Sequence, residues 1–423
     1  MERKVIHVLT HSIHGLHQEG KTLNYSFYDS LWHFRLARRI QAASDEYEQE
    51  CWGVDSKLSK EIRWEKDGIS VRVFPCKTLR YIGDWYSHDL LRALKAESRK
   101  QGVLLHFHGL FSYNTLLAPL VINKVPMIVQ HHDTPASLLE QARDSPRASI
   151  KLGAFTLYLL AGQWFLERVS IPRFDRIFIL NREEEEYVTR LAGTEKVQRL
   201  SMGVDFNDFV HTSKDTARQM LELAPDKRYI LFVGNLYLRK GVDYLLKSFP
   251  AVLKECPNAV LLVVGTGFRR ERFVKLAHEL GVDARVEFAP SDANLPRVPD
   301  NVLPLYYSAA DVVVMPSLRE GLPIVALEAL ACDAPLVATN VGGLPDVVAT
   351  FKAGILVEPR SPEALARAVT DVLNGRKSFV IDRQSGERAY DWRVIAAKNL
   401  AVYDTLFHEY YCKQKVNSFR LGY

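Results

Sequence analysis

The stretch DVVVMPSLREGLPIVALEAL, residues 311–330, shows most clearly how this chain folds. Four apolar residues, 312–315, are followed by a polar loop with a glycine, and then by a run rich in alanine and leucine. The apolar run predicts a strand buried on both faces. The run after the loop predicts a helix, with Pro323 suited to its first turn. The stretch is therefore a strand, loop and helix unit of an α/β fold.

The same alternation of strands and helices extends to both sides. Residues 242–253 place six apolar side chains on one face at helical spacing, and residues 365–373 repeat the pattern. Strands this apolar predict parallel sheets covered on both faces, in doubly wound Rossmann-like domains. The predicted strands are 5–9, 69–74, 103–107, 126–131, 176–180 and 197–200, then 230–233, 260–264, 286–288, 312–315, 336–338 and 355–357.

The length of 423 residues exceeds what a single hydrophobic core usually organises, so two domains are expected. The apolar periodicity is interrupted within residues 203–224, where polar residues and glycine gather. We therefore predict an N-terminal domain of residues 1–205, a second domain of residues 206–388 and a C-terminal helical segment of residues 389–423.

Composition sets limits on location and partners. With 47% hydrophobic and 25% charged residues and a net charge of +5, the chain lacks the basic stripe that nucleic-acid binding needs. The five cysteines have no paired spacing, which favours a reducing cytoplasm. The apolar run 5–9 is too short for a signal peptide, and the longest stretch without charged residues, 102–123, contains polar residues and a proline. We expect a cytoplasmic protein without a transmembrane helix.

Three loops after predicted strands carry candidate ligand-binding groups. In ILFVGNLYLRKG, residues 230–241, Arg239 and Lys240 suit a phosphate, although an ordinary solvated turn explains them equally well. LLVVGTG, residues 261–267, ends in a Gly-x-Gly turn that allows close backbone approach. Glu320 and Glu328 are separated by seven residues around a turn whose N–H groups, at residues 321–324, suit an anion.

These motifs, in this order over residues 229–373, resemble the donor domain of the retaining GT-B glycosyltransferases of family 4. VATNVGGLPDVV, residues 337–348, belongs to the same pattern. The resemblance implies a GT-B fold, in which two Rossmann-like domains face a central cleft. The second domain would bind the nucleotide-sugar donor and the first the acceptor, and residues 390–407 resemble the last helix, which crosses back to the first domain.

The resemblance also implies a role for each matching residue. Lys240 would neutralise the donor diphosphate, and Glu328 would bind the ribose hydroxyls. Glu320 would act at the sugar and phosphate. The family often has arginine where this chain has Asn235, and we hypothesise that Arg239 compensates. The other implied donor contacts are Gly234, Gly267 and Phe288, the last two near the base, and the backbone of Gly321, Leu322, Pro323 and Ile324.

The first half offers weaker signals. VPMIVQHHDTP, residues 125–135, ends a strand in two histidines and Asp133, and the resemblance favours His132 beside the anomeric carbon of the donor. A histidine held by local backbone, or a register shifted to His131, remains the alternative. His108 is expected to line the cleft. Where the family has a paired-glycine loop, this chain has only the separated Gly15 and Gly20.

The resemblance implies retaining sugar transfer by a front-face mechanism, from a nucleotide-diphosphate sugar to a hydroxyl of a glycan, glycolipid or small molecule. The donor is a substrate, so no cofactor is expected, and no Asp-x-Asp motif suggests a metal. Residues 152–169 are apolar enough to rest on a membrane, although a packed helix is the commoner reading. A GT-B epimerase or phosphorylase, or a non-catalytic nucleotide-sugar-binding protein, stays open.

Overall fold

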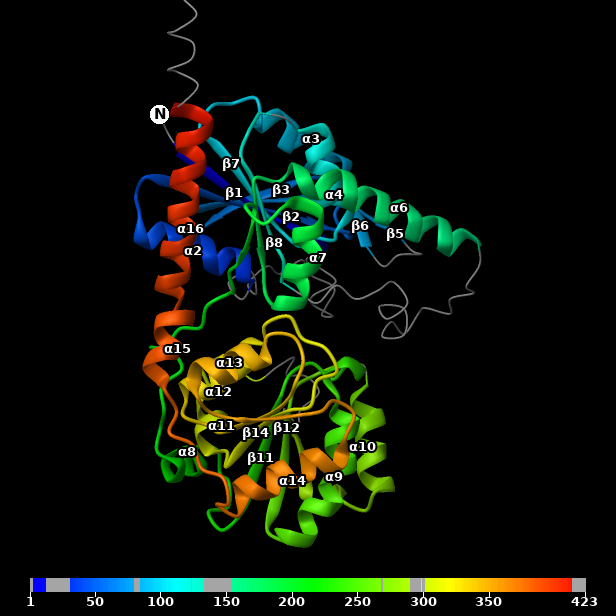
Figure 1. Ribbon diagram of the computed structural model, residues 1–423, viewed down its shortest axis with the longest axis vertical. Helices are drawn as coiled ribbons and strands as arrows, with labels where there is room; N and C mark the ends of the chain where they lie inside the picture. Colours follow the sequence, from blue (N-terminus) through cyan, green and yellow to red (C-terminus); the bar gives the residue numbers. More distant parts are fainter. Residues whose placement is uncertain are drawn as a thin grey trace, which may run out of the picture. The chain divides into compact units, whose positions relative to one another are not determined.

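The computed structural model describes residues 3–12, 31–79, 84–122, 124–132, 154–267, 269–289, 298 and 301–412. The chain forms two compact units (Figure 1). The first combines Met1–Met202 with Trp392–Tyr423, and the second is Gly203–Asp391. These limits lie within three residues of the boundaries read from the sequence, at 205 and 388.

The first unit is built on an eight-stranded sheet of order β10-β9-β8-β7-β1-β2-β4-β3. All its neighbours pair in parallel except β3, which runs antiparallel to β4. The expectation of a purely parallel sheet is therefore wrong at this edge, where a short strand is half exposed and reverses on a turn. The strands are β1 (Arg3–Ser12), β2 (Tyr47–Asp55), β3 (Ile62–Lys66), β4 (Ile69–Pro75), β7 (Val103–His108), β8 (Met127–Gln130), β9 (Arg176–Ile179) and β10 (Val197–Arg199).

Helices cover both faces of this first sheet. Leu90 and Leu94 of α3 pack with Phe107 and Leu105 in one apolar cluster, and α2 and α16 pack with the opposite face. In Figure 1, α16 runs beside α2, although these helices are far apart in the sequence. A two-stranded hairpin, β5 (Lys77–Leu79) and β6 (Asp84–Tyr86), completes the unit. The helices are α2 (Trp32–Ala43), α3 (His88–Glu97), α4 (Tyr113–Val121), α6 (Ala154–Ser170), α7 (Arg182–Ala192) and α16 (Trp392–Phe407).

The second unit contains a six-stranded, fully parallel sheet of order β13-β12-β11-β14-β15-β16. All six strands were predicted, and β14 and β16 match the predicted limits. The residues of β12, β14 and β15 are all buried because helices lie on both faces, whereas the edge strands β13 and β16 are largely half-buried. The strands are β11 (Arg228–Val233), β12 (Ala259–Val264), β13 (Val286–Ala289), β14 (Val312–Met315), β15 (Leu336–Thr339) and β16 (Ile355–Val357).

The helices of the second unit follow the predicted apolar faces. Val242, Leu245 and Phe249 of α9 are buried against the sheet, as are Leu365 and Val369 of α14. One detail differs: Pro323 has an extended backbone and caps α12, which begins one residue later. The helices are α8 (Lys214–Met220), α9 (Val242–Glu255), α10 (Arg270–Glu279), α11 (Leu303–Ala309), α12 (Ile324–Ala331), α13 (Leu344–Phe351), α14 (Pro362–Leu373) and α15 (Arg383–Tyr390).

Both sheets reverse their strand order at one point. In the second unit the chain moves outward from β11 through β12 and β13, then returns to place β14 on the other side of β11. In the first unit the same reversal lies between β1 and β7. Ligands of such folds bind beyond the carboxyl ends of the strands at this reversal. The residues that follow β11 and β14, and those at the ends of β1 and β7, are therefore the first to consider.

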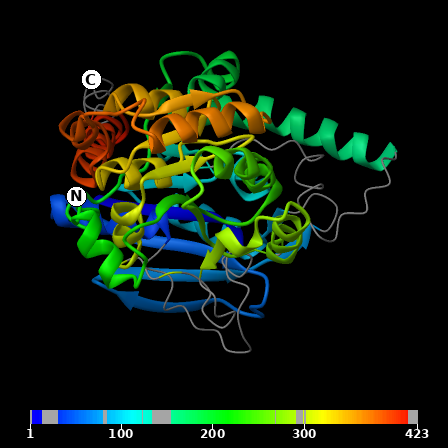
Figure 2. The same ribbon diagram turned by 90° about the horizontal axis from the view of Figure 1, so that it is seen from below.

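The apolar helix α6 is the exposed element of the first unit. Its first turns extend away from the strands in both views (Figures 1 and 2). Trp164 and Phe165 are 54% and 60% exposed, and the Arg168 guanidinium lies 3.7 Å from the centre of the Trp164 ring. Within the ranges given above, no helix has both the length and the apolar character needed to cross a bilayer.

Candidate active site

A lysine and a glutamate meet where the strand order of the second sheet reverses. Lys240 follows β11 in a short 3-10 turn, and Glu320 lies in the loop after β14. The Lys240 Nζ is 2.5 Å from Glu320 Oε1, and the Ser317 hydroxyl donates to the same oxygen at 2.7 Å. Glu320 is only 4% exposed. The two residues singled out from separate motifs are thus one ion pair at the expected end of the sheet.

The two loops that carry this ion pair are tied together through their backbones. The Leu318 N–H donates to the Arg239 carbonyl at 2.7 Å. Gly241 has φ +69°, and a Cβ there would lie 1.9 Å from the Pro316 carbonyl oxygen. Any side chain at residue 241 would therefore push the loops apart. The Lys-Gly of the sequence motif is explained by this close approach.

A third loop, after β15, supports the glutamate turn from the other side. The Gly343 N–H donates to the Gly321 carbonyl at 2.7 Å. Gly342 has φ +55°, and a Cβ on it would lie 1.9 Å from the Glu320 carbonyl oxygen. Sequence reasoning quoted this NVGG segment without giving it a role. The two adjacent glycines could have predicted this contact, since residues without a side chain allow one backbone to approach another.

The second glutamate is also held in place. Glu328 lies half-buried on α12, and its Oε2 accepts a hydrogen bond of 2.7 Å from the Tyr307 hydroxyl on α11. Tyr307 is fully buried, so it fixes the orientation of the carboxylate. Leu322 and Ile324, between the two glutamates, are half-buried beside the start of this helix. The positive end of the α12 dipole therefore lies in the same turn as Glu320.

The glycines after β11 and β12 lie side by side. Gly265 has φ +156°, and a Cβ on it would lie 1.9 Å from the Gly234 carbonyl oxygen. Gly267 has φ +155° and faces the Leu236 backbone in the same way. Asn235, between them, is exposed. The two predicted glycine turns thus lie against each other and form one edge. Their backbones can approach this closely only because the glycines have no side chains.

Phe288 lies on β13, next to this glycine edge in strand order. Its ring is half-buried, and the Arg270 guanidinium is 5.6 Å from the ring centre. The Arg270 N–H donates to the Gly267 carbonyl at 3.1 Å, which links α10 to the Gly-x-Gly turn. A half-exposed aromatic ring beside backbone N–H and C=O groups is suited to stacking and hydrogen bonding with a planar ligand.

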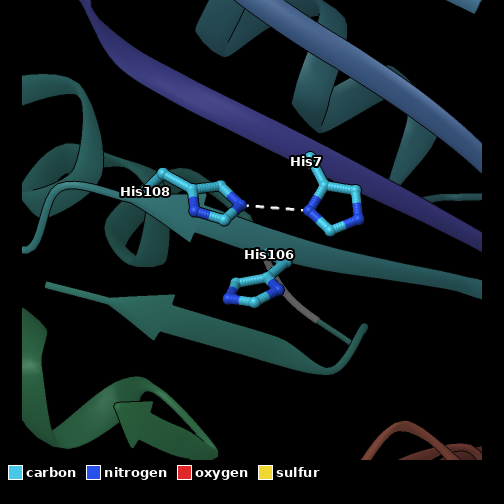
Figure 3. A group of neighbouring side chains, drawn as sticks. All are labelled: His7, His106 and His108. Carbon is cyan, nitrogen blue, oxygen red and sulfur yellow. Dashed lines mark hydrogen bonds between the residues drawn. The ribbon is translucent and has the colours of Figure 1, made fainter. Parts of the chain in front are cut away.

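In the first unit, the candidate residue His132 is joined to a row of buried histidines. His132 Nε2 is 2.8 Å from His108 Nδ1, and His108 Nε2 is 3.0 Å from His7 Nδ1. Figure 3 shows His7 on β1 and His108 on β7 joined by that contact, with His106 beside them. The Trp32 ring stacks on His132, with ring centres 4.4 Å apart. The end of β7 is where the strand order of this sheet reverses.

The neighbouring His131 has a different environment. It is 5% exposed, and its Nδ1 lies 3.2 Å from Glu184 Oε1, a carboxylate that also accepts from the Leu180 and Asn181 N–H groups. His131 therefore anchors β8 to the start of α7. His131, the alternative register for the functional histidine, has its ring buried inside the unit beside Glu184.

Burial keeps the histidine row neutral. The pKa of His7 is lowered to about 4 by burial, opposed in part by its hydrogen bond to Gln49. The pKa values of His106 and His108 are lowered well below their usual range, again by burial first and then by neighbouring imidazoles. The ionic form of any of these rings would be an unpaired buried charge. Near neutral pH the row therefore acts through hydrogen bonds.

Three predicted residues lie outside the described ranges, namely Gly15, Gly20 and Asp133. Sequence reasoning, for its part, did not single out His7, Gln49, Ser317 or Tyr307 as site residues. His106 and His108 alternate in LLHFH, so their shared face was readable. Nothing in the sequence indicated that His7 and Gln49 on other strands would meet them.

A hollow of about 690 Å³ lies at the opposite end of the second sheet. Its lining includes Arg228, Asn258 and Asp311, which stand at or before the starts of β11, β12 and β14. Asp311 is already paired with the Arg218 guanidinium at 2.7 Å and accepts from the Tyr229 N–H at 2.7 Å. Because these groups satisfy each other and lie at the amino ends of the strands, we do not assign the site there.

Comparison with solved structures defines the class of fold. The chain superposes on sucrose-phosphate synthase from Thermosynechococcus elongatus with a TM-score of 0.70 over 96% of this chain and 100% of that one, at 22% identity. HepE from Anabaena, solved in complex with UDP, gives 0.64 over 95% and 100%, at 18% identity. The protein therefore has the GT-B fold, with two Rossmann-like domains.

Sequence comparison gives a family match over most of the second unit. Residues 213–392 match the family described as glycosyl transferases group 1. An uncharacterized glycosyltransferase of Methanocaldococcus jannaschii is 32% identical over 248 residues, which are 56% of this chain and 62% of the relative. A D-inositol 3-phosphate glycosyltransferase of Mycolicibacterium smegmatis is 32% identical over 253 residues, 58% of this chain and 56% of the relative. The chain thus spans about three-fifths of the length of these relatives.

Proposed function

We propose that the protein is a retaining glycosyltransferase of family 4 that moves a hexosyl group from a nucleotide-diphosphate sugar to a hydroxyl acceptor without a metal. The observation that carries this proposal is the Lys240–Glu320 pair, held by three loops at the strand-order reversal of the second sheet. The group 1 match of residues 213–392 and the UDP bound by HepE support a nucleotide-sugar donor.

In the proposed reaction, Lys240 stabilises the diphosphate as the sugar leaves. Without the donor, its charge is balanced by Glu320, so donor binding must place a phosphate oxygen where it shares or replaces that carboxylate. A preorganised cation and the positive end of α12 favour the developing negative charge by several kcal/mol, which is about the scale of one well-placed donor. Glu328, oriented by Tyr307, would hold the ribose hydroxyls.

The acceptor is a glycan, a glycolipid or a small polyol, and His132 would act near the transferred sugar. The names of the relatives supply one concrete candidate, D-inositol 3-phosphate. We place the reaction in the cytoplasm, with α6 resting on a membrane face. The exposed Trp164 and Phe165 beside Arg168 support that contact, because aromatic and cationic side chains favour a lipid headgroup region.

Thermal shift against UDP-, GDP-, ADP- and CMP-sugars tests the donor site without an acceptor. A ligand that binds the folded state only, present at a hundred times its Kd, stabilises that state by about 2.7 kcal/mol. We expect one nucleotide family to raise the melting temperature, and Glu328→Gln to abolish the rise. Glu363→Gln, the same change at an exposed position of α14, should keep it. No response to any donor contradicts the proposal.

Analysis of the products distinguishes three rival functions from the proposed one. A GT-B phosphorylase would need free phosphate and release a sugar phosphate, and an epimerase would return a donor of altered configuration. A non-catalytic binding protein would show the thermal shift without any product. The proposed enzyme forms a glycoside and a nucleoside diphosphate in the absence of added phosphate.

A further inference from the structure

The buried imidazoles of the first unit form a chain that has a direction. Starting from the strand β2, Gln49 Oε1 lies 2.9 Å from His7 Nε2. His7 Nδ1 lies 3.0 Å from His108 Nε2, and His108 Nδ1 lies 2.8 Å from His132 Nε2. Gln49, His7 and His108 are buried at 3%, 0% and 0% exposure. His7 and His108 therefore each use both ring nitrogens, one toward each neighbour.

The amide of Gln49 sets the direction. Its Nε2 donates to the Tyr47 carbonyl at 3.2 Å, so its Oε1 must face His7 as an acceptor. His7 then carries its proton on Nε2, and its Nδ1 accepts. A neutral imidazole has one N–H, so His108 must donate from Nε2 and accept at Nδ1. The same step places the proton of His132 on Nε2.

A metal ion held by His7, His106 and His108 is the competing explanation, because one nitrogen from each lies within 4.8 Å of the others. The rings do not converge as metal ligands would. His106 and His108 stack at 25° with centres 4.4 Å apart, so their in-plane lone pairs run side by side. His7 and His108 already bond to each other (Figure 3), and His106 Nδ1 lies 2.7 Å from the Tyr403 hydroxyl. The hydrogen-bonded chain accounts for these contacts without moving a ring.

We propose that Gln49, His7 and His108 are positioning residues that fix the tautomer of His132, with its proton on Nε2 and with Nδ1 as a hydrogen-bond acceptor. Trp32, stacked on the ring, holds its plane. A consequence for the ligand rests on the proposed function. An acceptor nitrogen suits a hydroxyl, which can donate, and disfavours a phosphate or carbonyl oxygen, which cannot. A ligand group that reaches Nδ1 of His132, an atom buried in this structure, is therefore a hydroxyl of the sugar or of its acceptor.

The tautomers are measured directly by long-range proton–nitrogen NMR correlation on the full chain labelled with ¹⁵N-histidine. Signals are assigned with single variants such as His132→Gln and His108→Gln. In the wild type, His7, His108 and His132 should all show a protonated Nε2 and an unprotonated Nδ1. A proton on Nδ1 of His132 overturns the proposal, as do stoichiometric zinc in the purified protein and coordination shifts that chelation removes.

Two variants test the role of Gln49. Gln49→Met keeps the size of the side chain but removes the acceptor, so His132 should become a mixture of both tautomers. Gln49→Glu keeps an acceptor oxygen and should retain the Nε2-protonated form. All six tryptophans lie in the first unit, so their fluorescence shows whether each variant is folded. An unchanged His132 tautomer in folded Gln49→Met overturns the proposal.

Failure here and failure of the proposed function are distinguishable. The NMR measurement needs no donor, and the thermal shift depends on residues of the second unit. If the His132 tautomer is as proposed but no donor binds, the positioning role of the imidazoles is supported and the proposed sugar transfer is refuted. If a donor binds and its sugar is transferred while the His132 tautomer is reversed, the proposed enzyme activity is retained and only the positioning role is refuted.

Discussion

At the residue scale, the functional proposal depends on one buried ion pair whose two members arrive from different motifs. Lys240 is 16% exposed and Glu320 5% exposed in their side chains. Removing one partner of such a pair leaves the other charge buried, poorly solvated and without its counter-charge. Stability and activity are therefore linked at this pair, and they must be separated by experiment.

Lys240→Met should lower the free energy of unfolding by about 3–5 kcal/mol, because Glu320 loses its cation. The double variant Lys240→Met with Glu320→Gln removes the stranded charge and should recover most of that loss. Its sugar transfer should nevertheless stay about 100- to 1,000-fold below wild type, the usual cost of losing one preorganised charge-stabilising group. Calorimetry and product formation are measured on the same samples. Turnover that returns with stability would exclude Lys240 from the reaction.

Arg239 is the second cation of this loop, and the resemblance to family 4 leads us to expect an arginine where this chain has Asn235. The backbone carbonyl of Arg239 accepts a hydrogen bond from the Leu318 N–H. The variant Arg239→Ala keeps this backbone hydrogen bond. We expect the donor KM to rise, or turnover to fall, at least tenfold, which is about 1.4 kcal/mol of transition-state stabilisation. Arg319→Ala, on the neighbouring half-buried arginine, is the matched comparison. Steady-state kinetics unchanged by the Arg239 variant would refute compensation.

The buried histidines predict how stability depends on pH. The folded-state pKa of His7, about 4, lies below its ordinary value of 6.5. The neutral ring is favoured by folding, so its contribution is complete above pH 6.5 and is lost as the pH falls toward 4, by roughly 3 kcal/mol in all. Urea unfolding followed by tryptophan fluorescence should show this slope. His7→Gln removes one of these titrating groups and should make the slope smaller, and an equal slope in the variant would contradict the assignment.

At the element scale, strands rich in branched apolar residues were predictable, and polar strands were not. β14, with four consecutive buried apolar residues, was placed at its true limits. β2 was missed because YEQECWGVD contains Glu48, Gln49 and Glu50. It is nevertheless buried, since Glu50 accepts from Lys4 at 2.7 Å and Gln49 from His7. Side chains on neighbouring strands supply those partners, and sequence periodicity cannot show them.

The residues of the candidate active site show the same difference between what could and what could not be predicted from the sequence. Glycine turns, the Lys-Gly step and the two glutamates were readable, because each is local to a strand and its loop. The contact between Lys240 and Glu320, the Tyr307 support of Glu328 and the directional chain of imidazoles were not. Each joins elements that become neighbours only through the strand order. Sequence reasoning thus gave the groups, and the fold gave their pairing.

Asp311 illustrates a tie between elements whose role is stability. Its carboxylate is 6% exposed, pairs with Arg218 of α8, and accepts from the Tyr229 N–H at the start of β11. Asp311→Ala should cost about 3–5 kcal/mol, because Arg218 is left buried and unpaired. Asp226→Ala, at a 70% exposed side chain, should cost little. Chemical denaturation followed by circular dichroism measures the free energy of unfolding of both variants. An equal loss of this free energy in the two variants would contradict the stabilising role of Asp311.

At the scale of the whole molecule, each unit has its own apolar clusters and its own sheet. All tryptophans belong to the first unit, so fluorescence reports on that unit alone, whereas calorimetry reports on both units. The C-terminal helix α16 returns the chain to the first unit, where Tyr403 contacts His106. Helix α16 and the histidine row are thereby parts of one core.

The most direct test of the account is a transfer assay with the nucleotide sugar that gives the thermal shift. D-inositol 3-phosphate and a panel of monosaccharides and alkyl glycosides serve as acceptors, without added phosphate or metal and with a chelator present. We predict release of the nucleoside diphosphate together with a glycoside that retains the anomeric configuration of the donor, by NMR. A glycoside of inverted configuration, or release no faster than in the Lys240→Met, Glu320→Gln double variant, would contradict the central claim.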